Sequence, residues 1–293
     1  MDKLPATGLL GARSLVGECV IPLLVHEGCQ VFAFSRAASD RETESGVTWL
    51  HLDALSPTHP PEIKDWLCVA PIWVLPQYFP MLEACGVHRV VAVSSTSLFT
   101  KTGSSDPAEN ATGARLAEGE ARLRTWAESR GVEWVVLRPT LIYGLGRDKN
   151  IAEIARFIRR FGFFPLLGKA MGLRQPVHAE DVAGACLAAL KSPVAANRAY
   201  NISGAETLPY REMVSRVFAA LQKRPRLATI PLVIFRMAVA CLRLFPRYRN
   251  WSAAMAERMN RDLVFDHAEA ARDFGFSPRP FRLGSEDVAR RMG

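Results

Sequence analysis

Short apolar runs alternate with longer stretches of mixed apolar and polar residues, most regularly over the first half of the chain. The apolar runs are continuous, which is typical of strands buried on both faces of a parallel sheet. The mixed stretches carry apolar residues at helical spacing and predict amphipathic helices. The predicted strands run up to Leu10 and over 30–34, 47–52, 66–69, 89–93 and 134–137. This alternation predicts an α/β fold with a doubly wound parallel sheet.

The second half of the chain predicts fewer strands and a smaller unit. The predicted helices follow Gly17 and cover 77–85, 114–130, 182–190 and 210–221, with a further short strand at 199–202. We expect a first domain over 1–145, with a strand and a helix contributed from about 172–202. A small C-terminal α/β subdomain is expected to take most of 146–293.

The composition is that of a globular chain, with 293 residues of which 49% are hydrophobic and 23% charged. The net charge of +8 is scattered over predicted helices, so we expect anionic small-molecule ligands and no nucleic acid.

The cysteines form no CxxC pair and the histidines no HExxH spacing, which predicts reduced thiols, a cytoplasmic location and no metal site. Arg13 and Glu18 interrupt the first apolar run, so we interpret it as a strand and helix rather than a signal peptide.

A turn of small residues joins the first strand to the first helix. Gly11 and Gly17 flank Ser14 with the spacing of a dinucleotide-binding loop, where backbone N–H groups and the positive end of a helix meet a pyrophosphate. Gly8 could also open this fingerprint, but starting at Gly11 leaves a helix of about three turns before Gly28. An ordinary strand-to-helix turn is the alternative. The residues predicted to contact a dinucleotide here are Gly11, Arg13, Ser14, Leu15, Val16 and Gly17.

The end of the second strand indicates which dinucleotide fits. An acidic residue there holds the ribose hydroxyls, whereas a basic residue accommodates a 2′-phosphate. Ser35 and Arg36, together with Arg13, therefore favour NADP(H) over NAD(H), the alternative being a solvated arginine. Asp53-Ala54 closes the third strand. A carboxylate at this place either reaches the adenine amine or only stabilises the turn, in which Asp is a favoured residue type. The remaining predicted cofactor contacts follow later strands and are Ala70, Pro71, Ser94 and Arg138.

Several motifs together resemble one enzyme family. Besides the Gly11–Gly17 turn, they are Ser94–Ser97, Leu137–Gly144, the R-x-x-V-H-x-x-D-V-A-like segment Arg174–Ala183, and Phe274–Arg279. In these motifs the chain resembles the extended short-chain dehydrogenase/reductases, the NAD(P)-dependent epimerase/dehydratase group. The resemblance covers essentially the whole chain. It implies a Rossmann-like fold, a nicotinamide coenzyme and a small C-terminal substrate subdomain.

The resemblance also implies a mechanism. A tyrosine, whose pKa is lowered by a lysine four residues later, exchanges a proton with a substrate hydroxyl while hydride moves to or from the nicotinamide. Ser95 matches the residue that holds the substrate oxygen, with a loop-capping hydroxyl as the alternative. The tyrosine and lysine positions fall on Thr112 and Leu116, and neither side chain titrates near neutrality. We therefore predict that the usual relay is absent.

Other polar residues are possible substitutes for the missing pair. Tyr143 follows the sixth strand and is a candidate catalytic residue, with a packing aromatic as the alternative. Lys101 and Arg115 are further polar candidates near the pocket. His178 matches a position that supports the fold more often than it does chemistry.

The related enzymes hold an anionic substrate group with basic residues of the second half. Arg147, Lys169 and Arg174 are the predicted substrate-binding residues, and a solvated surface position is the alternative for each. The substrate is expected to be a small molecule or a molecule that resembles a sugar nucleotide.

The segment 230–249 differs from the other predicted helices. Its apolar residues run nearly all round a helix, and arginines cluster towards its end. A buried helix or the wall of a hydrophobic pocket is one interpretation, and an interfacial helix touching anionic lipid is the other.

Two functions are compatible with these features. One is an NADP(H)-preferring oxidoreductase or epimerase-like enzyme that works without the tyrosine–lysine pair. The other is a non-catalytic NADP(H)-binding sensor or scaffold, because a fold does not establish an activity. A monomer and a homodimer both remain open.

Overall fold

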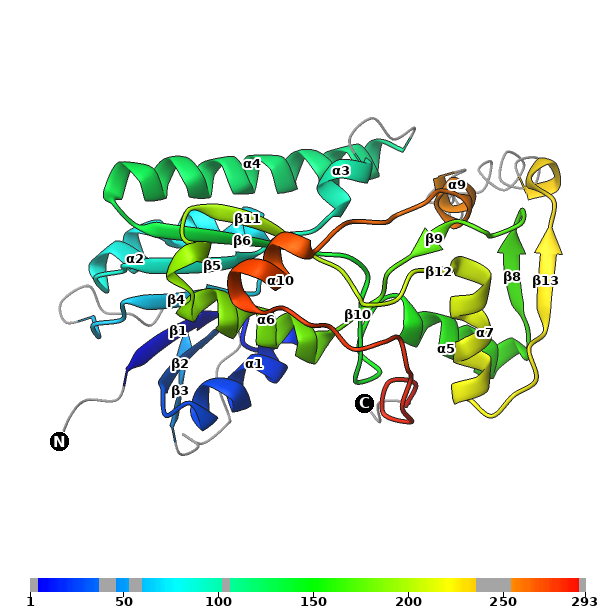
Figure 1. Ribbon diagram of the computed structural model, residues 1–293, viewed down its shortest axis with the longest axis horizontal. Helices are drawn as coiled ribbons and strands as arrows, with labels where there is room; N and C mark the ends of the chain where they lie inside the picture. Colours follow the sequence, from blue (N-terminus) through cyan, green and yellow to red (C-terminus); the bar gives the residue numbers. More distant parts are fainter. Residues whose placement is uncertain (1–4, 37–45, 53–59, 102–105, 236–253, 290–293) are drawn as a thin grey trace.

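The computed structural model describes residues 5–36, 46–52, 60–101, 106–235 and 254–289. At its centre lies a seven-stranded sheet in the order β11-β6-β5-β4-β1-β2-β3, with every neighbouring pair parallel (Figure 1). The strands are β1 (Ala6–Leu10), β2 (Gln30–Ser35), β3 (Val47–His51), β4 (Asp65–Cys68), β5 (Arg89–Val93), β6 (Glu133–Pro139) and β11 (Arg198–Ile202). The predicted doubly wound α/β fold is confirmed.

Helices cover both faces of this sheet (Figure 1). They are α1 (Leu15–His26), α6 (Ala179–Lys191), η1 (Ile72–Tyr78), α2 (Phe79–Ala84), α3 (Ser97–Lys101), α4 (Pro107–Arg130), η2 (Pro193–Ala195) and α10 (Ala268–Phe274). On one face Val20 and Leu24 of α1 share a buried core with Val182 of α6. On the other face Leu82 of α2 and Leu123 of α4 belong to a second core. Burial on both faces is why these strands read as unbroken apolar runs.

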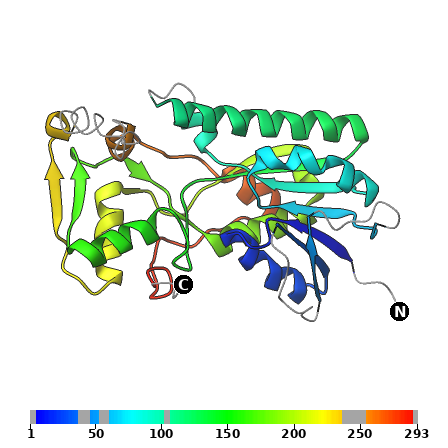
Figure 2. The same cartoon turned by 180° about the vertical axis from the view of Figure 1, so that it is seen from behind.

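A third core lies in the smaller C-terminal part, beside the carboxyl ends of the sheet strands (Figures 1 and 2). It is built from α5 (Ile151–Phe161), β8 (Phe164–Leu167), α7 (Tyr210–Ala220), β13 (Leu227–Ile230) and α9 (Ala254–Asn260). Two short strand pairs, β7 (Ile142–Tyr143) with β10 (Val177–His178) and β9 (Leu173–Arg174) with β12 (Leu208–Pro209), connect this part to the sheet.

Two element boundaries differ from the sequence-based expectation. The helix expected over 77–85 is a 3₁₀ helix followed by the short α2, because Pro76 lies inside the first and Pro80 at the start of the second. The long helix begins at Pro107 rather than Ala114. Asp106 caps it by accepting a hydrogen bond from the Ala108 N–H at 2.9 Å, so the Asp-Pro pair was the missed signal.

Some predicted features lie outside the described residues. They include Asp53 and Ala54, and residues 236–249 of the segment 230–249. Within the part of the chain that the structure describes, no helix is long and apolar enough to cross a membrane.

Candidate functional site

The turn after β1 is shaped by two glycines. Gly11 has φ +87°, and a Cβ there would lie 2.5 Å from the Ala70 backbone N. A Cβ on Gly17 would lie 2.4 Å from the Gly11 carbonyl oxygen, so α1 starts in direct contact with the turn. Gly8 lies within β1, whereas Gly11 begins the turn that follows the strand. Positions 11 and 17 therefore both require glycine, because the turn packs closely against the Ala70 backbone and the start of α1.

Ser14 caps helix α1. Its hydroxyl accepts a hydrogen bond from the Gly17 N–H at 3.0 Å. The N–H groups of Leu15 and Val16 belong to the same first turn, where a helix offers no intrahelical acceptor. The helix N-terminus thus presents donors and partial positive charge at the carboxyl edge of the sheet, the arrangement that binds anions.

The predicted phosphate-binding arginines both lie near the ends of the outer strands. Arg13 is exposed, and its guanidinium lies over the Trp49 ring of β3 at 5.8 Å from the ring centroid. Arg36 is exposed directly after Ser35, the last residue of β2. Its carbonyl accepts a hydrogen bond from His51 Nε2 at 2.9 Å, which fixes the backbone there.

The segment after β4 runs against the same turn. The Val69 N–H donates to the Leu10 carbonyl at 2.9 Å, and the Ala70 backbone meets Gly11. Pro71 follows and precedes η1. The structure therefore brings Ala70 and Pro71 to the carboxyl edge beside the predicted loop.

A buried ionic cluster lies where β5 and β6 end under α4. Glu120 of α4 accepts a hydrogen bond from the Ser94 hydroxyl at 2.5 Å. The same carboxylate accepts from Arg138 Nε at 3.0 and 3.1 Å and from Nη2 at 2.5 Å. Only 7% of the Glu120 side chain and 16% of the Arg138 side chain is exposed. Ser94 and Arg138 thus have an internal partner that the sequence analysis did not assign.

Ser95 directly follows Ser94 at the edge of the sheet. It is half-buried, and its hydroxyl oxygen accepts a hydrogen bond from the Ser97 N–H at 3.1 Å. This contact is the loop-capping one considered as an alternative, and the hydroxyl hydrogen is still available to a ligand.

The two relay positions lie on α4, which contains neither tyrosine nor lysine. The Thr112 hydroxyl donates to the Ala108 carbonyl, one turn earlier, at 2.8 Å. Leu116 is buried in the core between α4 and the sheet. Arg115 next to it is exposed, and Lys101 at the end of α3 is half-buried.

Tyr143 lies in the core of the smaller part. Its ring is fully buried and meets His178 and Phe281 edge to face, with ring centroids 5.1 and 4.9 Å apart. Its hydroxyl donates to the Arg282 carbonyl at 3.4 Å. Burial raises the pKa of the Tyr143 phenol, whereas a tyrosine relay needs that pKa lowered. This placement is that of a packing aromatic and gives no support to the catalytic role predicted for Tyr143.

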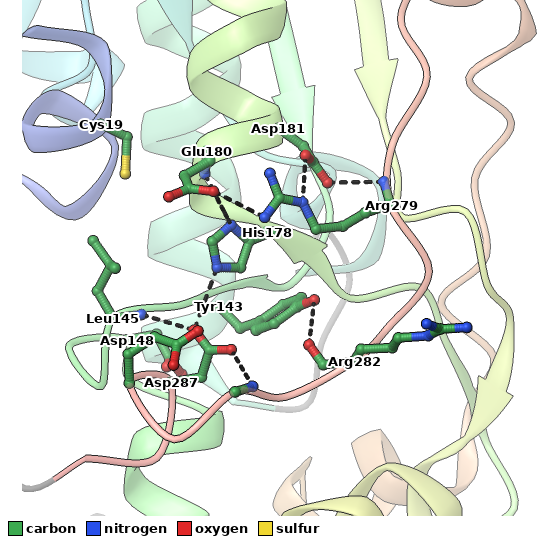
Figure 3. Close-up of polar contacts among 12 residues, drawn as sticks. Cys19, Tyr143, Leu145, Asp148, His178, Glu180, Asp181, Arg279, Arg282 and Asp287 are labelled. Carbon is green, nitrogen blue, oxygen red and sulfur yellow. Dashed lines mark hydrogen bonds and ion pairs between the residues drawn. The ribbon is translucent and has the colours of Figure 1, made fainter. Parts of the chain in front are cut away.

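His178 joins the C-terminal segment to the sheet (Figure 3). Its Nδ1 accepts from the Glu180 N–H at 3.3 Å, so Nε2 carries the hydrogen and donates to Asp287 Oδ1 at 3.3 Å. Asp287 also accepts from the backbone N–H groups of Leu145 and Gly284, at 3.1 and 2.9 Å. Burial opposes ionisation of Asp287, yet these donors hold the pKa of its carboxyl below the usual value.

A cavity of about 290 Å³ opens beside this network. It is lined by Leu145, His178 and Glu180 on one side and by Arg279, Arg282 and Asp287 of the C-terminal segment on the other. Arg279 is itself held by Asp181 and Glu180, each at 2.8 Å (Figure 3). His178 and its neighbours therefore hold the C-terminal segment against β10 and α6, which is the fold-supporting role expected for His178.

The three predicted substrate-binding residues are not gathered at one point. Arg147 forms an ion pair with Glu18 of α1 and donates to the Arg13 carbonyl at 3.1 Å, so it lies beside the predicted phosphate turn. Lys169 is exposed on the loop after β8. Arg174 is buried, and its guanidinium donates to the carbonyls of Leu173 and Arg261 at 2.7 and 2.8 Å.

The surroundings of Arg174 are those of a structural anchor. Its guanidinium also donates to the Arg258 carbonyl and lies over the Tyr210 ring, 5.5 Å from its centroid. Burial lowers the pKa of Arg174 to about 10. Backbone carbonyls thus occupy the donors predicted for a substrate anion.

The parallel sheet, the glycine turn and helix α1 define a Rossmann-like α/β fold. Residues 79–203 match the model of the NAD dependent epimerase/dehydratase family. This match confirms the resemblance inferred from the motifs.

Individual relatives resemble the chain over different lengths. It is 28% identical over 207 residues to the uncharacterized protein y4nG of Sinorhizobium fredii, a match that covers 67% of this chain and 50% of that protein. It spans 30% and 59% of the length of two further curated relatives. It is 25% identical to the 2-alkyl-3-oxoalkanoate reductase of Stenotrophomonas maltophilia, with 96% of each chain covered.

Solved structures confirm the fold. The structure of MoeE5 in complex with UDP-glucose and NAD superposes with a TM-score of 0.68 and 20% sequence identity, covering 97% of this chain and 96% of that one.

Proposed function

We propose that this chain binds NADP(H) at the carboxyl edge of its sheet and lacks the tyrosine-dependent proton relay of its relatives. The observation that carries this proposal is the contrast between two sites. The Gly11–Gly17 turn has the glycine spacing of a dinucleotide-binding loop and leads into a helix N-terminus, whereas Thr112 and Leu116 stand at the positions of the relay pair.

The residues of the turn fit the coenzyme. The backbone at Gly11 and Gly17 leaves no room for a Cβ, and the first turn of α1 offers N–H donors at Leu15 and Val16 to a diphosphate. When bound, the nicotinamide ring supplies or accepts hydride. This chain's own contribution is to bind and orient the coenzyme.

The preference for the 2′-phosphate rests on Arg13 and Arg36. Both are exposed near the ends of β2 and β3, and the residue before Arg36 is Ser35 rather than an acid. A basic residue at this point favours NADP(H), since a guanidinium pairs well with a phosphate.

The second candidate is an oxidoreductase or epimerase-like enzyme that acts on a small or sugar-nucleotide-like substrate without the relay. Its support is the similarity, over 96% of both chains, to a protein named as a reductase. Ser95 is the side chain that would hold a substrate oxygen, because its hydroxyl hydrogen is not used by the Ser97 contact.

Titration calorimetry with NADPH and NADH tests coenzyme binding. We expect NADPH to bind at least about tenfold more tightly than NADH, and Arg36→Ala to remove most of that difference, because one charge-assisted phosphate contact is lost. Arg122→Ala is the matched control, since Arg122 is an exposed arginine on α4 paired with Glu118. Equal affinities for both coenzymes would contradict the NADP(H) preference, and no binding of either would overturn the proposal.

A substrate panel separates the two candidates. The purified chain is incubated with NADPH and a series of carbonyl compounds and sugar nucleotides, while absorbance follows coenzyme oxidation. The proposal expects binding without turnover. Turnover that is abolished by Ser95→Ala would instead establish the second candidate.

A further inference from the structure

The end of the smaller part that lies away from the sheet is formed by two neighbouring turns. One comprises the last turn of α5 and the two residues after it, 159–163, and the other follows α7, at residues 223–226 (Figure 1, lower right; Figure 2, lower left). They are joined because the Phe164 N–H donates to the Arg226 carbonyl at 2.9 Å, where the parallel strands β8 and β13 begin. We call these two turns together the basic tip.

The basic tip carries positive charge without compensating acids. Its basic residues are Arg159, Arg160, Lys223, Arg224 and Arg226, and all but the half-buried Arg159 are exposed. Neither the stretch 157–165 nor the stretch 219–228 contains Asp or Glu. Across the described residues, no carboxylate forms an ion pair with any of the five. The tip therefore presents a strong local positive potential.

Exposed aromatic rings lie among these charges. Phe161 is 52% exposed and Phe163 is 39% exposed. Both rings rest on Phe157, with ring centroids 4.6 and 5.8 Å away, so they are held in place rather than loosely attached. The Arg160 guanidinium lies over the Phe161 ring, 5.4 Å from its centroid.

The favourable interaction of cations with helix C-termini explains only some of the basic residues of the tip. Arg159 and Arg160 lie in the last turn of α5, where cations favour the helix dipole. Arg224 and Arg226 lie beyond the end of α7 and gain much less from its dipole. Two exposed phenylalanines next to the cations are not explained by dipoles at all.

We propose that the basic tip binds the surface of a membrane that contains anionic phospholipids. Arginine and lysine side chains attract the headgroups, and phenylalanine rings enter the boundary between headgroups and acyl chains. A nucleic acid would need a free ring face for base stacking, but Phe161 already faces Arg160 and Phe157. The tip lies at the end of the smaller part away from the sheet, so a membrane bound there does not contact the sheet (Figure 1).

The test is co-sedimentation of the full chain with vesicles. One set is phosphatidylcholine alone, and the other contains about 30% phosphatidylglycerol. We expect binding to the anionic vesicles only, and loss of that binding at about 0.5 M salt, where charges are screened within a few ångströms. Absence of binding to anionic vesicles at low salt would overturn the proposal.

Matched variants assign the binding to this surface. Arg160→Glu with Arg224→Glu is expected to weaken binding at least about tenfold, because two attractions become repulsions. Lys64→Glu with Arg122→Glu changes the net charge equally at exposed positions elsewhere and should leave binding within about twofold. Equal effects of the two double variants would contradict the assignment to the tip.

The aromatic contribution is tested separately. Phe161→Ser with Phe163→Ser should weaken vesicle binding while keeping its salt dependence, and Val194→Ser, at a 60% exposed valine elsewhere, should not. Circular dichroism and thermal melts verify that each variant is folded. If the tip variants instead abolish binding to a short fluorescent DNA, with no vesicle binding by the parent protein, the tip is a nucleic-acid surface and the proposal fails.

Discussion

The two halves of the carboxyl edge of the sheet differ in whether their polar groups are paired within the protein. At the β1–α1 turn, two glycines pack against neighbouring backbone, and the first turn of α1 presents N–H groups that have no intrahelical acceptor. Under α4, by contrast, the polar groups bind one another: Ser94 and Arg138 are held by Glu120, and the Thr112 hydroxyl by a helix carbonyl. The polar side chains under α4 thus serve the fold, whereas the polar groups presented at the turn belong to the backbone. Four predictions test this contrast.

The largest effect is expected at Glu120. Glu120→Gln leaves the buried Arg138 without its counter-charge, so we expect the free energy of unfolding to fall by about 3 kcal/mol or more. Urea denaturation measures it. Glu118→Gln on the same helix breaks only an exposed pair with Arg122 at 3.8 Å, and should cost less than about 0.5 kcal/mol. A similar small cost for both would mean that Glu120 does not hold the strand ends.

At the binding turn, Gly17→Ala is expected to weaken NADPH binding by about 100-fold, or about 2.7 kcal/mol. The added Cβ meets the Gly11 carbonyl and displaces the start of α1. Calorimetry measures the affinity. Gly184→Ala in α6 is the control, because a Cβ there has no atom within 4 Å among those described. Unchanged NADPH affinity in Gly17→Ala would remove the turn from the coenzyme site.

Tyr143 gives a pH-dependent effect. Its folded-state pKa is raised by burial, so above about pH 10 the unfolded chain loses the phenol proton while the folded chain retains it. Stability is therefore lost as the pH rises above about 10, and Tyr143→Phe should remove this part of the loss, about 1 kcal/mol by pH 11. Denaturation at pH 8 and pH 11 measures the difference. An identical pH dependence in the variant would contradict the buried placement.

The smallest effect is expected at Thr112. Because its hydroxyl donates to the Ala108 carbonyl, Thr112→Val should change the free energy of unfolding by less than about 0.5 kcal/mol and leave NADPH affinity unchanged. Calorimetry and denaturation measure both. A shift in the pH profile of any coenzyme turnover would show instead that Thr112 takes part in chemistry.

Local sequence patterns predict most of the fold and the glycine turn between β1 and α1. Continuous apolar runs predicted the sheet strands, and the spacing of Gly11 and Gly17 predicted the turn, because these depend on a few consecutive residues. The early start of α4 was missed although Asp106-Pro107 is a local signal. The placement of the site residues in the smaller part could not be predicted, because no local pattern distinguishes an arginine that becomes buried from one that stays in solvent.

The sequence by itself determined that α4 carries no tyrosine or lysine, that Arg36 rather than an acid follows β2, and that the strands are buried on both faces. Only the tertiary structure decided what the polar residues do. Glu120 meets Arg138 across 18 positions, Arg174 reaches the Arg261 carbonyl 87 positions away, and the Tyr143 hydroxyl bonds a carbonyl 139 positions away. Burial and partners at such distances are set by how the chain packs, and no local pattern encodes them.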